Sequence, residues 1–401
     1  MILLRNTGTI ARGIRLPIIK EGDNLVEIVV ESLLSTQKEN DFKFKDNDVV
    51  AVTESILARS QGNYITVDDI ASEIQEEFSG KDGIGVVFPI LSRNRFSMIL
   101  KGIARAGFDI YMQLSYPRDE VGNPLFNPAK LRELDINPYS DVLSEKDYLD
   151  NFSDYRHPYT GINYLKLYKE IFQAESDANL EFILANDPAV ILKYTSEVIA
   201  ADIHTRVETK AILKNNKKAK IIGLDDICSS QIHNRGFNEN YGLLGSNKAT
   251  DERLKLFPRN VDQFVNQVQQ AIYKETGTEV EVMVYGDGAY KDPTGKIWEL
   301  ADPVVSPGYT SGLEGTPNEV KLKYLADNDL SDLKGEELLD AMKDKIESKA
   351  NDLVGNIKAQ GTTPRKLTDL LGSLSDLVSG SGDKGTPVIL IQGYFDNLAS
   401  D

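Results

Sequence analysis

The 401-residue sequence contains one cysteine, one tryptophan and three histidines. A single cysteine excludes a framework of intrachain disulfides, and it fits a protein of the reducing cytoplasm, where we expect this chain to be located. No apolar run approaches the roughly 20 residues that a membrane-spanning helix needs. Residues 1–25 also lack the continuous apolar core of an export signal, so we expect no membrane partner.

Basic residues are in the minority as well. Lys and Arg number 45 against 62 Asp and Glu, which gives a formal net charge of −17. We therefore expect no nucleic-acid partner, because binding a phosphate backbone requires clustered Lys and Arg. Small-molecule substrates, including a nucleotide, remain possible, since phosphates can reach an acidic site through divalent metal ions. With 41% hydrophobic residues, the chain can build large cores and two or three domains.

Familiar phosphate-binding loops are missing too. There is no Walker A sequence, which argues against P-loop chemistry. Gly380, Gly382 and Gly385 match the spacing Gly-x-Gly-x-x-Gly. They follow an expected helix and precede an expected strand, however, which is the reverse of the dinucleotide-binding order. We interpret them as a connecting turn.

The histidines and the cysteine give no metal or nucleophile pattern. His157, His204 and His233 are too far apart in the sequence to form a zinc-ligand motif. His233 lies in a polar loop and can line a site, but structural or solvated roles are common for a lone histidine. Cys228 has no local signature of a nucleophile, and we expect it to be buried.

Apolar periodicity predicts the following elements. Helices are expected within residues 18–35, 56–62, 68–78, 188–215, 260–276, 333–358 and 368–378. Strands are expected at 49–52, 85–89, 108–116, 220–224, 280–285 and 387–392. Asp23 or Asn24 is the expected cap of the first helix. Residues 139–168, dense in Tyr and Asp, are expected to be irregular with short helices.

The character of the chain changes at about residue 80. Strand-like pieces there are followed by a Pro-, Gly- and Asn-rich turn at 117–128, and helical patterning resumes only at about 188. We therefore predict a core made of residues 1–79 and 186–401, with an inserted lobe of residues 80–185.

The segment 280–298 contains the strongest candidate for a metal- or phosphate-binding site. An alternating apolar strand leads into Gly-Asp-Gly around Asp287, and a loop with Lys291 and Lys296 follows before the only Trp. A carboxylate at a strand end with small neighbours suits a divalent cation. The same residues also suit an ordinary hairpin turn, because Gly-Asp-Gly and Asp-Pro-Thr-Gly both form turns.

Several segments occur in an order that resembles a known family. They are Leu-Pro-Ile-Ile-Lys-Glu-Gly-Asp-Asn-Leu at 16–25, the strand and Ser-Ile-Leu-Ala-Arg-Ser-Gln-Gly at 48–62, Asn-Asp-Pro-Ala-Val-Ile-Leu-Lys at 186–193, Ile-Cys-Ser-Ser-Gln at 227–231, Val-Tyr-Gly-Asp-Gly at 284–288 with Gly-Lys-Ile-Trp at 295–298, and the helix, loop and strand at 374–393. Together they resemble the gamma-glutamyl ligases of deazaflavin coenzyme biosynthesis (coenzyme F-420-0:L-glutamate ligase). The resemblance covers roughly residues 1–75, 186–330 and 364–395; the lobe shows no counterpart.

The resemblance implies a fold and a reaction. The fold is α+β, with mixed and antiparallel sheets flanked by helices, and the assembly is a homodimer. Family members phosphorylate a substrate carboxylate with GTP, assisted by a divalent metal, and the amine of L-glutamate attacks the acyl phosphate. We therefore expect Mg²⁺ or Mn²⁺ as cofactor and GTP or ATP as co-substrate.

The resemblance also implies site residues. Asp287 matches the metal ligand at the strand end, with Asn238 or Glu239 as the partner ligand. Arg59 and Lys20 are the candidate catalytic cations, although both also suit a solvated surface. The expected substrate- and nucleotide-binding residues are Ser55, Ser60, His233, Asn234, Arg235 and Lys296.

Departures from the family pattern support an alternative function. Gly288 replaces a Thr, Glu299 replaces a basic residue after the Trp, and Arg59 stands where Lys is usual. The loop 233–240 lacks the usual acidic ligand, so the metal ligand there is Asn238 or Glu239, or is lost. The alternative is a non-catalytic protein that keeps the ligase fold and binds a nucleotide or metabolite.

Overall fold

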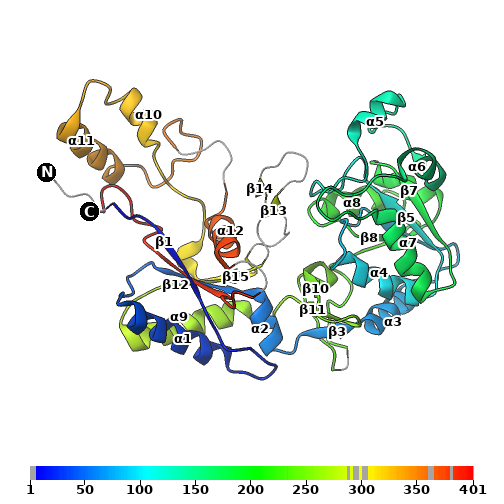
Figure 1. Ribbon diagram of the computed structural model, residues 1–401, viewed down its shortest axis with the longest axis horizontal. Coiled ribbons are helices and arrows are strands. Elements are labelled where there is room, and N and C mark those ends of the chain that lie inside the picture. The colour runs from blue at the N-terminus through cyan, green and yellow to red at the C-terminus, as the bar shows by residue number, and fades with distance from the viewer. Residues whose placement is uncertain are drawn as a thin grey trace.

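The computed structural model describes residues 6–232, 234–286, 290–291, 298–299, 306–359, 365–379 and 383–400. Two bodies, each built around a sheet, lie side by side and are connected by a small sheet between them (Figure 1). We call them the core body and the lobe. In the described part of the chain, no helix is long and apolar enough to cross a membrane.

The core body contains a mixed five-stranded sheet. Its strands, in spatial order, are β1 (Ile10–Ile14), β16 (Val388–Gln392), β2 (Val49–Thr53), β12 (Glu281–Tyr285) and β15 (Gly308–Tyr309). β2 and β12 are parallel neighbours, and the other pairs are antiparallel. This arrangement agrees with the expected α+β class of mixed sheets flanked by helices.

Helices cover both faces of the core sheet. Alternate residues of β2 and β12 point to opposite sides, as the pleat requires. Val50 and Val282 join α1 (Leu25–Asn40) and α9 (Val261–Thr276) on one side. Ala51 and Met283 face α12 (Leu367–Ser379) on the other. The two central strands are therefore fully buried, which explains their continuous apolar sequences.

The predicted cap of α1 is Asn24. Its side-chain oxygen accepts a hydrogen bond from the backbone N–H of Glu27 at 3.4 Å, while Asp23 accepts the N–H of Lys20 at 2.6 Å. α9 ends at Gly277, whose φ of 71° suits glycine. Both core helices therefore begin or end where the local sequence predicts.

The lobe is a six-stranded sheet that is parallel except at one edge. Its order is β6 (Leu143–Ser144), β7 (Leu180–Leu184), β5 (Ile110–Leu114), β4 (Ile84–Val87), β8 (Glu197–Ala200) and β9 (Lys220–Gly223). Only the β6–β7 pair is antiparallel. Helices lie on both faces, which is typical of a doubly wound α/β domain.

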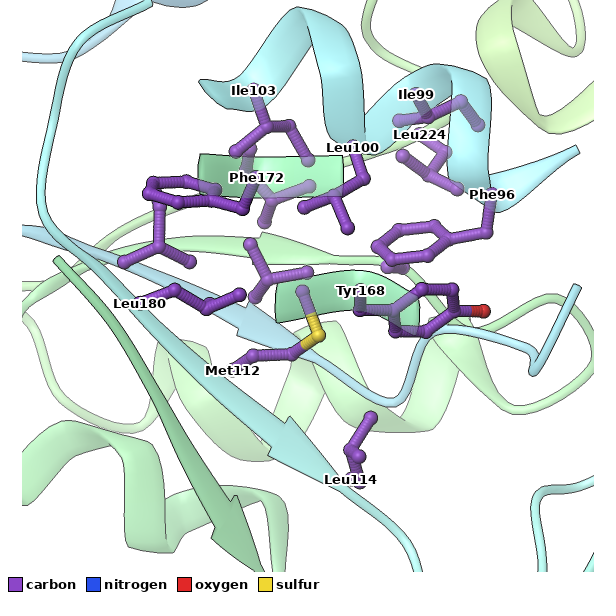
Figure 2. Packing of buried hydrophobic residues seen from close by; sticks show 14 of the residues in the cluster. Phe96, Ile99, Leu100, Ile103, Met112, Leu114, Tyr168, Phe172, Leu180 and Leu224 are labelled. Atoms are coloured by element: carbon purple, nitrogen blue, oxygen red, sulfur yellow. The ribbon is translucent and has the colours of Figure 1, made fainter. Parts of the chain in front are cut away.

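The larger lobe core lies under three helices. These are α3 (Val67–Glu77), α4 (Phe96–Arg105) and α7 (Tyr164–Glu175). In Figure 2, Phe96 and Leu100 of α4 meet Tyr168 and Phe172 of α7 above Met112 of β5. The opposite face is covered by η1 (Pro188–Lys193) and α8 (Arg206–Lys214). α5 (Pro128–Glu133) and α6 (Glu145–Phe152) precede α7 along the chain.

The lobe sheet extends beyond the predicted boundary at residue 185. β8 and β9 pair with β4 and with each other, so residues 197–223 belong to the lobe sheet and not to the core sheet. The sequence predicts helix throughout 188–215, whereas the structure places β8 between η1 and α8. β8 is only four residues long and buried, and so short an apolar run cannot be assigned by periodicity.

Smaller elements complete the fold. β10 (Ser246–Lys248), β11 (Arg253–Leu256) and β3 (Tyr64–Thr66) form the sheet between the two bodies, next to η2 (Gly242–Gly245). η3 (Ser311–Leu313), α10 (Leu322–Asp327) and α11 (Gly335–Glu347) follow β15. α11 ends at Glu347, eleven residues before the predicted helix end at 358. In the segment after it, the backbone N–H of Leu353 donates to the side-chain oxygen of Asn318 at 3.1 Å. β13 (Tyr290–Lys291) pairs with β14 (Trp298–Glu299).

Candidate functional site

Two parallel strands of the core sheet end side by side. β2 ends at Thr53 and β12 ends at Tyr285, and these residues are paired in register. α2 (Glu54–Ser60) follows β2 without a loop, which places Ser55 in its first turn. Asp287 comes two residues after Tyr285 in the sequence. The ends of β2 and β12 therefore form the edge at which the predicted site begins.

Three predicted site residues, His233, Lys296 and Asp287, lie outside the described residues, as does Gly288. Their roles stay predictions. The antiparallel pairing of β13 with β14 agrees with the hairpin interpretation of this segment. Asp287 precedes β13 in the sequence, so this pairing leaves its predicted role as a metal ligand untested.

Lys20 and Arg59 come from segments that touch. The backbone N–H of Gly22 donates to the carbonyl of Ser60 at 2.8 Å, which joins the turn before α1 to the end of α2. The side chains of Lys20 and Arg59 are both exposed. The Ser60 hydroxyl is buried and donates to the carbonyl of Leu57 at 2.9 Å. The structure thus joins the two segments that carry the predicted cations and gives Ser60 a contact within its own helix.

The predicted loop 234–240 is fixed beside the same helix end. Gly236 donates its N–H to the carbonyl of Tyr64 at 2.7 Å. Asn63 exchanges hydrogen bonds with the backbone of Phe237, both at 3.0 Å. Arg259 donates to the side-chain oxygen of Asn63 at 3.0 Å. Asn63 is fully buried, so it forms a structural link between α2 and the loop.

Asn238 has a fully occupied side chain. Its amide group donates to the carbonyls of Phe257 and Pro258 at 3.2 and 3.1 Å, and its oxygen accepts the N–H groups of Asn240 and Tyr241 at 3.1 and 3.0 Å. A cation on that oxygen would have to displace two N–H groups. Asn238 therefore does not fit a metal, in contrast to the neighbouring carboxylate.

That carboxylate, Glu239, is exposed, as is Asn234. Among the described side chains, no group of three or more His, Cys, Asp and Glu residues is arranged to hold a metal ion. Asp287 is not part of that set. A metal at this edge would accordingly depend on Asp287, and Glu239 is the predicted carboxylate ligand whose side chain the structure leaves exposed.

Arg235 points to the lobe helix α3. Its guanidinium forms an ion pair with Glu73 and donates to the carbonyl of Asp69 at 3.4 Å. Glu73 also accepts the backbone N–H of Cys228 at 2.9 Å. Cys228 is buried as expected, and burial followed by the charge of Glu73 raises the pKa of its thiol. Arg235 thus connects the loop 234–240 to helix α3 of the lobe.

A buried ion pair lies behind this edge. Glu54, the first residue of α2, and Lys255 of β11 approach within 2.5 Å, and both residues are buried. Local sequence patterns do not predict this pair, because its members are 201 residues apart. The only available signal was a carboxylate directly after an apolar strand.

A pocket of about 930 Å³ lies elsewhere in the core body. It is bordered by α10 and by residues 394–398, and includes Tyr324, Ile346 and Tyr394. None of the predicted site residues that the structure describes contributes to its lining. We therefore keep the candidate site at the ends of β2 and β12.

Comparison with known proteins identifies the family. The family model described as F420-0:Gamma-glutamyl ligase matches residues 13–393, a range that includes the whole lobe. A comparison with curated proteins gives no match. Membership supports a ligase activity in general. Because the match spans nearly the entire chain, the protein belongs to the F420-0:gamma-glutamyl ligase family.

Proposed function

We propose that this protein is a nucleotide- and metal-dependent ligase that joins an amino acid, L-glutamate, to a carboxylate acceptor through an acyl phosphate. The observation that carries the proposal is the family match over residues 13–393. The shared position of the Lys20, Arg59 and 234–240 segments supports it, because a triphosphate needs donors from several segments.

In this reaction, the exposed side chains of Lys20 and Arg59 would neutralise negative charge on the phosphate oxygens. The γ-phosphoryl group leaves GTP or ATP and forms a bond to an acceptor oxygen; the glutamate amine then attacks the carbonyl carbon, and inorganic phosphate leaves. Negative charge accumulates on phosphate oxygens in a protein of net charge −17. Lys20 and Arg59 can neutralise part of that charge. Ser55, Asn234, His233 and Lys296 are the proposed hydrogen-bond donors to nucleotide and substrate.

Asp287 and Glu239 are the proposed holders of Mg²⁺ or Mn²⁺. The cation would supply additional charge neutralisation on the phosphate oxygens. Glu54 and Lys255 lie behind the edge and fix the start of α2. Their role is to position Ser55 and not to contact the substrate.

A second function is favoured by one observation. The amide of Asn238 is occupied by four hydrogen bonds, so the loop that supplies an acidic ligand in the family has only Glu239 left. With a weaker metal site, the protein would bind a nucleotide or metabolite without turnover. This is the alternative that an activity assay must address.

The test is an assay of phosphate release with GTP or ATP, Mg²⁺ or Mn²⁺, L-glutamate and a panel of carboxylic acids. The ligase proposal expects release that requires both amino acid and acceptor, with an amide product of matching amount by mass spectrometry. Lys20→Gln and Arg59→Gln should each lower kcat/KM by about tenfold or more. Lys274→Gln, at an exposed lysine near the end of α9, is the matched control and should leave it unchanged.

Nucleotide binding without any phosphate release would support the alternative function instead. We also propose a homodimer, as the family resemblance implies. Sedimentation equilibrium would show twice the mass of one 44.5 kDa chain, and a monomer at all concentrations would contradict this part of the proposal.

A further inference from the structure

The lobe has a topological switch point of its own. Its parallel strands lie in the order β7, β5, β4, β8, β9. Along the chain, β4, β5 and β7 are added towards one edge of the sheet, and β8 and β9 are then added towards the other edge. α4 and α7 cover one face, and η1 and α8 cover the other. In open α/β sheets, ligands bind at the carboxyl ends of the two strands where the order reverses. Here those strands are β4 and β8.

Three loops meet at this edge and are fixed to one another. Asp119, after β5, accepts the N–H of Leu91 in the loop after β4 at 2.9 Å. Glu120 accepts the N–H groups of Ile203 and His204 in the loop after β8, at 2.5 and 3.1 Å. The carboxylates thus serve to hold the loops in place. Their oxygens are occupied by donors of the chain itself.

Two arginines occur in the loops at this edge. Arg93, in the loop after β4, is exposed, and Arg118, in the loop after β5, is partly buried. Neither forms an ion pair with a residue in the ranges that the structure describes. Burial raises the pKa of the Tyr164 phenol, while Asp119 and Arg93 act on it in opposite directions. Burial likewise raises the pKa of Tyr155, and Arg118 opposes it. The charges of both arginines thus act on tyrosines at or just before the start of α7.

That segment holds a buried donor without an acceptor. His157 is 4% exposed, and its Nδ1 accepts the N–H groups of Tyr159 and Thr160 at 3.4 and 3.3 Å. Its hydrogen is therefore on Nε2, which has no hydrogen-bond partner among the described residues. The ring lies edge-on to Tyr164, with 5.7 Å between the ring centroids, and Tyr164 is also the tyrosine on which the charge of Arg93 acts.

A buried acceptor without a donor follows β8. Asp202 is fully buried; one carboxylate oxygen accepts the hydroxyls of Thr205 and Thr209 at 2.7 and 2.6 Å. The other oxygen has no partner in the described part of the chain. Buried polar groups are nearly always paired in native proteins, so these two exceptions need an explanation. A ligand at the switch point can supply one.

We propose that the carboxyl edge of β4 and β8 is a second binding site, separate from the ligase site, for a small metabolite that carries a phosphate or carboxylate group. Arg93, Arg118 and the Nε2–H of His157 are the donors to its oxygens. The loop 88–95 contains no glycine, so it lacks the close backbone cradle that a dinucleotide pyrophosphate requires. Recognition by side-chain donors suits a compact anion instead.

The test is isothermal titration calorimetry of the full chain with three probes: inorganic phosphate, glycerol 3-phosphate and L-glutamate. The proposal expects saturable binding of at least one probe. Arg93→Gln and Arg118→Gln should each weaken that binding by about tenfold, the usual effect of losing one charged hydrogen bond. Arg132→Gln, at an exposed arginine of α5, is the matched control and should bind as the wild type does. Binding of the phosphates alone, or of glutamate alone, would decide the class of anion.

Three results would overturn the proposal. The first is no saturable binding of any probe at tens of millimolar, and the second is an equal loss in Arg132→Gln. The third is loss of GTP and Mg²⁺ binding in Arg93→Gln or Arg118→Gln, which would make this edge part of the ligase site. Failure of the ligase proposal itself is distinguishable, because it would appear as an absence of phosphate release and amide product in the wild type, while binding of the small anions would stay intact.

Discussion

At the scale of single residues, the Glu54–Lys255 pair is the clearest determinant of the site. Lys255→Met removes the cation that pairs with the buried carboxylate of Glu54, and loss of one member of such a pair costs about 3–5 kcal/mol. Urea denaturation should show this loss. Lys248→Met, which breaks the exposed pair with Asp251, is the control and should have a far smaller effect, because solvent screens an exposed pair. Equal effects of the two substitutions would contradict the structural role of the buried pair.

Asp119 should make the stability of the lobe depend on pH. Burial, the largest influence, raises its pKa from 3.8 to about 6 in the folded protein. The folded state therefore binds the proton more tightly than the unfolded state. The associated stability is fully present below pH 3.8 and is lost as the pH rises through about 6, a change of about 3 kcal/mol.

The measurement is denaturation at several pH values in the wild type and in Asp119→Asn. Asparagine cannot titrate, so the difference in unfolding free energy between the two proteins isolates this group. The difference should fall by about 2 kcal/mol between pH 4 and pH 7, to the disadvantage of the wild type, because the unfolded carboxyl is already partly ionised at pH 4. A difference that stays constant over this range would refute the assigned cause.

Single residues also show where sequence reasoning reaches its limit. The sequence selected Asn238 by its place in a loop, but only the fold reveals that four backbone groups occupy its amide. The same reasoning overlooked Lys255, because its partner comes from a distant strand. Local patterns predict which residue types are present; their partners depend on long-range contacts.

At the scale of elements, the packing of α3 on α4 depends on Gly102. A Cβ at this position would meet the Cβ of Ile70 at 2.6 Å and the carbonyl of Val67 at 3.2 Å. Gly102→Ala gains about 1 kcal/mol of helix propensity but should lose about 1–3 kcal/mol through overpacking. We therefore expect a net loss of stability in thermal denaturation.

The control for this prediction is Gly8→Ala, where the added Cβ would meet nothing within 4 Å. It should change the melting temperature by little. Stabilisation of the lobe by Gly102→Ala would show that the two helices separate more easily than the structure implies.

Some helices and strands could be predicted from the sequence, and others could not. The amphipathic α1 and α9 and the strand β12 agree with their predicted positions to within a few residues, since each has a clear period or cap. β8 was missed because a short strand buried on both faces has no alternation. The parallel order of the lobe sheet could not be predicted at all, because it depends on pairings between distant segments.

At the scale of the whole molecule, the family supplies what local patterns could not. Ordered segments of the core predict the ligase family, and the match over residues 13–393 confirms it. The same match includes the lobe, whose segments show no recognisable counterpart in the family. The candidate ligase edge is in the core body, and the second proposed site is in the lobe, so the small sheet of β3, β10 and β11 connects them (Figure 1).

The most direct measurement of the central claim is thermal denaturation with GTP and Mg²⁺ in the wild type and in Asp287→Ala. A ligand that binds only the folded state stabilises by about 2.7 kcal/mol at a hundredfold excess over its dissociation constant. We predict a raised melting temperature in the wild type and none in Asp287→Ala, with both proteins equally stable in the absence of nucleotide. Equal stabilisation of the two proteins, or none in either with GTP or ATP, would contradict the account of a metal-bound nucleotide at the ends of β2 and β12.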